Sequence, residues 1–185
     1  MIAGCFVGIP LPEACVAAFS EMQHELKALT AAKYQKAESS HVTILYFGVL
    51  REEKVTKIMT RLEELATTLQ PFLIRSSGIG YFGTERHPRV AWIGVQPNDP
   101  LAALHTRIDA VVGAFAARRE DRAFRPHLTV ARITSARGFL DRKAAFEAIV
   151  AKYDFSFSAD RLCLYTADTE THERQEPLET FSFRG

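Results

Sequence analysis

The sequence contains the same short pattern twice. Residues 41–48 read HVTILYFG and residues 127–134 read HLTVARIT, so a histidine, an apolar residue, a threonine and a second apolar residue recur 86 residues apart in a chain of 185. Alternate side chains of a β-strand point to the same face, so His41 shares a face with Thr43, and His127 with Thr129. The repeat therefore predicts two equivalent strands, each with one polar and one apolar face.

The segments around these strands repeat as well, because each H-x-T strand has an amphipathic helix before and after it. The predicted strands are 2–9, 41–50, 72–80, 89–95, 127–134, 153–165 and 178–184, and the predicted helices are 12–29, 52–69, 98–115 and 140–151. The polar stretches 30–40, 81–88 (YFGTERHP) and 166–177 (TADTETHERQEP) are expected to be connections or loops. This order predicts an α+β fold, in which residues 1–185 form one domain of two similar lobes with a pseudo-twofold axis and a shared central cleft.

The cysteines and the hydropathy pattern indicate the compartment. Cys5, Cys15 and Cys163 are odd in number, have no CxxC spacing and lie among apolar neighbours, which is typical of buried thiols in a reducing environment. The apolar N-terminus lacks a positively charged first segment, and no apolar stretch approaches the about 18 residues of a membrane span. We therefore expect a cytoplasmic protein that makes no contact with a membrane. We also expect it to be a monomer.

The paired polar faces suggest a particular chemistry. If the two faces meet in the predicted cleft, it contains two imidazoles, which with a pKa near ~6.5 can act as one base and one acid. Such a pair suits in-line displacement at phosphorus, where threonine hydroxyls and an arginine can bind the phosphate oxygens. The sequence has no HExxH motif, acidic cluster or Cys/His ligand spacing, so we expect neither a metal nor a cofactor.

The two H-x-T strands and the segments around them resemble the motifs of a known family, the two-histidine (2H) phosphoesterase superfamily. Among its branches, the bacterial RNA 2′,3′-cyclic phosphodiesterases, also called 2′-5′ RNA ligases, are the most similar. The motifs that carry this resemblance, over residues 4–134, are CFVGIPLP, HVTILYFG, GIGYFGTERHPRVAWIGV, LAALHTRIDAVV and FRPHLTVAR. The resemblance implies a LigT-like fold, with antiparallel sheets lining the cleft and helices outside. It also implies hydrolysis of a 2′,3′-cyclic phosphate, on an RNA terminus or a small nucleotide, to a 2′-phosphate.

The resemblance also implies roles for five residues. His41 is the acid that protonates the departing O3′ and His127 is the base that activates water, although the sequence is equally compatible with the reverse assignment. Thr43 and Thr129 bind the phosphate, and Arg132 steadies the phosphate or stacks on the base. Arg132 follows His127 by five residues, so simple alternation places it on the opposite face unless the strand bends, bulges or ends there.

The chain departs from the family pattern at two places. Tyr46 stands where the family often has a basic residue, which removes a positive charge near the cleft. The C-terminal stretch LYTADTETHERQEPLETF replaces the serine and Gly-x-x-Tyr turn of the family, so contacts with substrate from this region stay open.

Three other functions are compatible with the same motifs. The site could join or cleave 2′-5′ linkages, or open another cyclic phosphate such as one on ADP-ribose. Alternatively, the chain could bind a nucleotide or an RNA end without turnover. The formal net charge of +1 favours short or terminal substrates over long duplexes in every case.

Overall fold

The fold is that of a computed structural model, and it is described for residues 1–29, 32–117, 123–168 and 176–185. Most of the predicted loop 166–177 therefore lies outside the described residues. The strands are β1 (Ile2–Pro10), β2 (Ala32–Tyr34), β3 (His41–Leu50), β4 (Phe72–Ile74), β5 (Ser76–Thr84), β6 (His87–Val95), β7 (His127–Ile133), β8 (Phe157–Ala159), β9 (Arg161–Tyr165) and β10 (Glu179–Ser182). The helices are α1 (Glu13–Lys27), α2 (Glu52–Ala66), α3 (Asp99–Val112), α4 (Ala136–Leu140) and α5 (Lys143–Val150), with 3₁₀ turns at Ala37–Ser39 and Gly113–Phe115.

Eight of the strands form one antiparallel sheet with an internal symmetry. Seven of them follow the order β10-β9-β1-β3-β7-β6-β5, and β2 pairs with β7 beside this path. The H-x-T strands β3 and β7 are central neighbours, joined by the pair Val42 and Leu128. On either side of this junction, β1 and β9 continue the first half and β6 and β5 continue the second. The two-lobed α+β architecture predicted from the repeat is confirmed.

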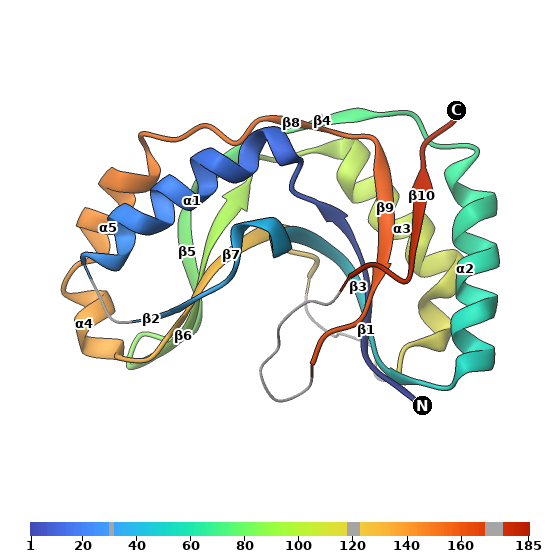
Figure 1. The fold of residues 1–185 in the computed structure, drawn as a ribbon, viewed down its shortest axis with the longest axis horizontal. Coiled ribbons are helices and arrows are strands. Elements are labelled where there is room, and N and C mark those ends of the chain that lie inside the picture. Colours follow the sequence, from blue (N-terminus) through green and yellow to red (C-terminus); the bar gives the residue numbers. More distant parts are fainter. Residues whose placement is uncertain (30–31, 118–122, 169–175) are drawn as a thin grey trace.

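The helices cover the sheet by crossing between the halves. α1, which follows β1, lies with α4 and α5 against the half that contains β5, β6 and β7 (Figure 1). α3, which follows β6, lies with α2 against the half that contains β3, β9 and β10 (Figure 1). Each half is therefore completed by a helix from the other half of the chain.

The apolar stripes predicted from helical spacing form the buried faces of these helices. In α2, the stripe Val55, Ile58, Leu62 and Leu65 is buried. In α3, the Asn98 side chain accepts a hydrogen bond from the backbone N–H of Leu101 at 3.0 Å, as expected of an N-cap followed by proline. Burial of an apolar stripe, rather than helix propensity, is what fixes such short helices.

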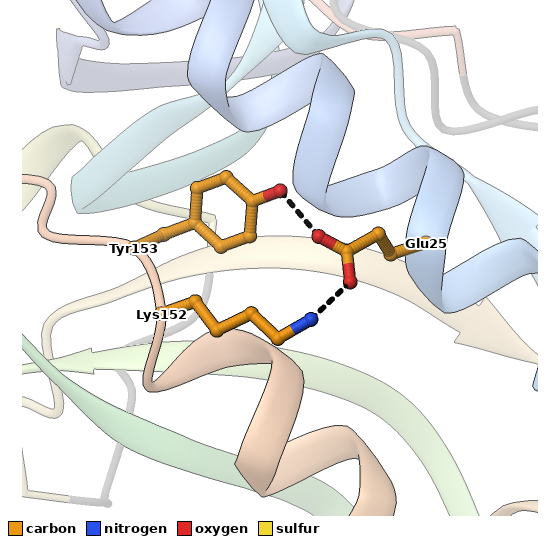
Figure 2. A network of polar contacts seen from close by, with 3 residues as sticks. All are labelled: Glu25, Lys152 and Tyr153. Atoms are coloured by element: carbon orange, nitrogen blue, oxygen red, sulfur yellow. Dashed lines mark hydrogen bonds and ion pairs between the residues drawn. The ribbon is translucent and has the colours of Figure 1, made fainter.

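A small polar network attaches α1 to the segment after α5. The carboxylate of Glu25 accepts from Lys152 Nζ at 2.5 Å and from the hydroxyl of Tyr153 at 2.6 Å (Figure 2). The hydrogen bond from Lys152, and then that from Tyr153, lowers the pKa of Glu25. The network therefore connects a helix from the first part of the chain to the half of the sheet built from the second.

Residues 81–88, predicted as a turn or loop between two strands, contain the turn, but most of them belong to the strands themselves. They form the end of a hairpin, in which β5 and β6 pair up to Thr84 and His87 and only residues 85–86 form the turn. Gly83 adopts a φ of +114° at a register shift, and the Thr84 hydroxyl accepts from the His87 backbone N–H at 3.1 Å. Pro88 fits because it precedes Val90, where pairing with β7 begins.

Other boundaries differ from the prediction because the chain changes partners there. Residues 72–80 divide between β4, which pairs with β8, and β5, which joins the main sheet. Residues 153–165 divide in the same way between β8 and β9. The stretch 30–40 contains β2, whose pairing with β7 is long-range and leaves no local pattern. The short helix predicted at 140–151 corresponds to α5, which lies within those bounds, and α4, which precedes it, was not predicted.

Two expectations about compartment can be compared with the structure. All three cysteines are free thiols, with Cys5 and Cys163 buried and Cys15 partly buried. Within the described residues, no helix combines the length and the apolar character needed to cross a membrane.

Candidate active site

The central strands carry the predicted polar residues on one face. Val42 and Leu128 pair across β3 and β7, and both side chains are buried. Their neighbours His41, Thr43, His127 and Thr129 are half-buried, as expected for the opposite face of each strand. The two H-x-T strands are therefore adjacent, with their polar residues on the same side of the sheet.

A bulge in β3 changes which later residues share this face. Thr43 and Leu45 pair with consecutive residues of β1, so Ile44 has no partner in that strand. Such an extra residue shifts the alternation by one position, so Tyr46 joins the face of Thr43. Both Thr43 and Tyr46 accordingly line a common cavity.

The equivalent bulge in β7 resolves the position of Arg132. Thr129 and Ala131 pair with consecutive residues of β6, which leaves Val130 without a partner there. Val130 follows Ile44 by the same 86 residues that separate the two histidines. The bulge places Arg132 on the face of Thr129. Simple alternation would have put it on the opposite face, and a bulge was one of the irregularities that could bring it to the cavity.

A cavity of about 370 Å³ lies at this face. Its wall includes four of the five predicted residues, His41, Thr43, Thr129 and Arg132, and also Tyr46. The fifth, His127, lies on the same strand face as Thr129 but outside the wall of this cavity. The wall also contains Phe6 and Gln35, together with Gly4, Ala167 and Asp168.

Each histidine ring is oriented by a hydrogen bond to the backbone carbonyl two residues before it. Nδ1 of His41 is 2.7 Å from the carbonyl oxygen of Ser39, and Nδ1 of His127 is 2.8 Å from that of Arg125. A carbonyl only accepts hydrogen bonds, so Nδ1 carries the proton in each ring. Nε2 is then the nitrogen that gains or loses a proton, and both histidines are prepared for the same chemistry.

Aromatic side chains from neighbouring strands hold the His41 ring. Phe6 of β1 lies with its ring centroid 4.7 Å from that of His41, and Tyr165 of β9 lies at 5.8 Å. Phe6 and Tyr165 stack on each other at 5.2 Å, and both are buried. The ring of His41 therefore rests on a rigid apolar surface.

His127 has a matching aromatic environment in the other half. Phe82 of β5 meets its ring edge-on at 4.7 Å, and Trp92 of β6 lies at 6.0 Å. Trp92 follows Phe6 by 86 residues, so the repeat could have identified it. Its indole lies over Gly80, where a Cβ atom would come within 2.3 Å of the ring.

Burial lowers the pKa of both His127 and Arg132, but the consequence for their charge differs. Burial lowers the pKa of His127, and the charge of Arg125 acts in the same direction, opposed by the hydrogen bond to the Arg125 carbonyl. His127 is therefore neutral at neutral pH, as a general base must be. Burial also lowers the pKa of Arg132, but a guanidinium stays charged at physiological pH.

The described residues contain no group of three or more histidine, cysteine, aspartate or glutamate side chains placed to hold a metal ion. The wall of the cavity offers the imidazole of His41, the hydroxyls of Thr43 and Thr129 and the guanidinium of Arg132, together with the polar groups of Gln35, Tyr46 and Asp168, and His127 adds a second imidazole on the same strand face beside it. The imidazoles, the threonine hydroxyls and the guanidinium suit an anionic ligand of tetrahedral shape, such as a phosphate diester.

This fold, with paired H-x-T strands at the centre of a two-lobed antiparallel sheet, defines the class of two-histidine phosphoesterases. The model of the 2′-5′ RNA ligase superfamily matches residues 11–171. The chain belongs to this superfamily.

Curated relatives agree with the assignment. The RNA 2′,3′-cyclic phosphodiesterase of Archaeoglobus fulgidus is 34% identical over 128 residues, which cover 69% of this chain and 71% of the relative. That of Bacillus subtilis is 28% identical over 183 residues, which cover 97% and 94%. The assignment of the chain to the phosphodiesterases, made from its sequence, is confirmed by these relatives.

Solved structures agree with the fold. A Thermus thermophilus protein superposes with a TM-score of 0.75 at 23% identity, covering 98% of both chains. Apo LigT of E. coli superposes with a TM-score of 0.73 at 17% identity, covering 98% of this chain and 97% of LigT. The predicted LigT-like fold is confirmed.

Proposed function

We propose that the protein hydrolyses a 2′,3′-cyclic phosphate, on an RNA terminus or a small nucleotide, to a 2′-phosphate without a metal. The observation that carries this proposal is the matching orientation of His41 and His127, each with Nδ1 bound to a carbonyl. Two oriented imidazoles on adjacent strands, beside a cavity lined by Arg132, suit proton transfer on both sides of a phosphorus atom.

In the proposed reaction, water attacks phosphorus and its proton passes to Nε2 of neutral His127. His41 starts as the imidazolium, with protons on both Nδ1 and Nε2, and the P–O3′ bond breaks as it donates the Nε2 proton to O3′, which leaves a 2′-phosphomonoester. Arg132 and the hydroxyls of Thr43 and Thr129 stabilise the negative charge that grows on the non-bridging oxygens. Solvent returns the proton from His127 to His41 between turnovers.

The names of similar proteins support the substrate class. Curated relatives in Archaeoglobus, Bacillus and Methanocaldococcus are RNA 2′,3′-cyclic phosphodiesterases. LigT has been crystallised with 3′-AMP and with ATP, so a protein of this fold accepts nucleotides. We propose that a nucleotide or RNA end occupies the cavity of this protein, and that the protein acts as a monomer.

We expect the purified protein to convert nucleoside 2′,3′-cyclic phosphates, and a short RNA with a cyclic end, to 2′-phosphates in excess chelator. Phosphorus NMR distinguishes the 2′-phosphate from the 3′-phosphate, and a 2′-5′-linked dinucleotide tests for cleavage of that linkage in the same assay. Binding without turnover, or loss of turnover in chelator, would contradict the proposal.

The pH dependence of kcat/KM tests the assignment of His127 as the base. Because burial and the charge of Arg125 lower the pKa of His127, we expect the acid limb to lie below the ordinary histidine value of 6.5. Arg125→Gln keeps the backbone carbonyl but removes the charge, so the acid limb should move to higher pH. Arg137→Gln removes an exposed arginine of α4 and should leave the limb unchanged. An acid limb above 6.5 that ignores Arg125→Gln would contradict this role.

A further inference from the structure

On the side of β7 that faces away from β6, two strands pair with it, β2 and β3, and the bulge at Val130 lies between the residues that they contact. β2 pairs with β7 as far as Ala131, and β3 pairs with it at Leu128. Between them, the carbonyl of Val130 accepts from the backbone N–H of Gln35 at 3.2 Å and from Nε2 of Gln23 at 3.2 Å. The backbone of Gln35 therefore continues the pairing of β2 by one hydrogen bond, and the side chain of Gln23 adds a second bond at the residue that turns Arg132 toward the cavity.

Gln23 is an unusual residue for its position. It lies in the apolar face of α1 and is only 4% exposed. Its Nε2 also donates to the backbone carbonyl of Gln35 at 2.7 Å, so the amide nitrogen serves two carbonyls and its orientation is fixed. A buried amide is costly unless it is hydrogen-bonded. Its place in an apolar face is explained by the two carbonyls that it binds.

The same contacts continue to the first histidine. The side-chain Nε2 of Gln35 donates to the carbonyl of Ser39 at 3.0 Å, and this carbonyl also accepts from Nδ1 of His41. Gln35 itself lines the cavity. A continuous series of contacts thus runs from the bulge at Val130, through Gln23 and Gln35, to the carbonyl that orients His41.

We propose that Gln23 is a positioning residue that couples the two halves of the site. It holds the β7 bulge that directs Arg132 into the cavity, and it holds the segment whose carbonyl selects the His41 tautomer. Its effect on turnover rests on the function proposed above. Its effect on His41 does not.

The first test is a double-mutant cycle with Arg132. Gln23→Met keeps the length of the side chain and removes both donors, and it should lower kcat/KM by about 10-fold. Because Gln23 acts partly through Arg132, the combined variant Gln23→Met with Arg132→Ala should lose clearly less than the product of the two single losses. Losses that multiply would overturn the proposal.

The second test reads the His41 ring directly, by long-range nitrogen NMR. At a pH high enough to make His41 neutral, the wild type should show its proton on Nδ1, and Gln23→Met should show a mixture of the two tautomers. Gln35→Met removes the side-chain link to Ser39 and leaves both bonds to the Val130 carbonyl in place, so it should alter the His41 tautomer. Arg132→Ala introduced into Gln35→Met should then cause the same loss as in the wild type. An unchanged His41 tautomer in Gln23→Met would overturn the proposal. If the wild type fails to hydrolyse cyclic phosphates, the proposed function is wrong. The NMR measurement still shows whether Gln23 controls the tautomer of His41, because it does not depend on turnover.

The matched control lies on the same helix. Glu25→Gln weakens the network with Lys152 and Tyr153, and so the attachment of α1, without touching the carbonyls of Val130 and Gln35. We expect it to keep the wild-type kcat/KM and the wild-type His41 tautomer. If Glu25→Gln and Gln23→Met changed kcat/KM and the His41 tautomer equally, Gln23 would act only by packing α1 against the sheet. That result would overturn the proposal.

Discussion

Replacement of His127 by alanine is expected to lower kcat for a nucleoside 2′,3′-cyclic phosphate by about 10²- to 10⁴-fold. The ring is half-buried between Phe82 and Trp92, and its Nδ1 is held by the Arg125 carbonyl. A neutral imidazole in this setting can take the proton of the attacking water, whereas alanine leaves that task to solvent. KM should change far less, because His127 lies outside the wall of the cavity that contains Arg132.

His41→Ala should cause a loss of the same order, because the departing oxygen then leaves without a proton donor. If the two histidines act in one step, the double variant should lose far less than the product of the two single losses. His24→Ala is the matched control, since His24 is exposed on α1 and distant in sequence from both motifs. Activity that survives either single replacement within about 10-fold would contradict paired acid–base catalysis.

The repeat is the reason that so much of this site could be predicted. The offset that relates His41 to His127 also relates Ser39 to Arg125, Ile44 to Val130 and Phe6 to Trp92. The predicted order of elements was accordingly correct for the H-x-T strands and the long helices. An internal repeat means that a structure inferred for one half of the chain applies to the other half as well, so no long-range contacts need to be known.

What the sequence could not provide are features set by pairing between distant strands. Alternation alone places Arg132 on the wrong face, since a bulge depends on the register between β6 and β7 and has no local signature. Gln23 was hidden for a related reason, because its partners Gln35 and Val130 become neighbours only in the folded chain. The turn between β5 and β6 was predicted, but both strands extend further into 81–88 than the sequence indicates, because their ends are fixed by pairing across the hairpin.

Replacement of Arg132 by alanine is the second large effect that we expect. Arg132 lines the cavity beside Thr129 and is the charged partner of the proposed phosphate. Removal of one preorganised donor to a developing oxyanion typically costs about 10²- to 10³-fold in kcat, and we expect a loss of this order in kcat/KM. Arg132→Lys should recover part of it, because lysine keeps the charge but not the planar, two-pronged geometry of the guanidinium.

The internal symmetry supplies the matched control for this prediction. Tyr46 occupies the position in β3 that Arg132 occupies in β7, lines the same cavity and is 55% exposed, but it carries no charge. Tyr46→Ala should therefore lower kcat/KM by less than about 10-fold, since it removes contact area and no charge-assisted hydrogen bond. Kinetics of the two alanine variants on one cyclic nucleotide would compare them directly. Equal losses in the two variants would mean that Arg132 contributes contact area and not charge. They would contradict the proposal that its guanidinium stabilises the transition state.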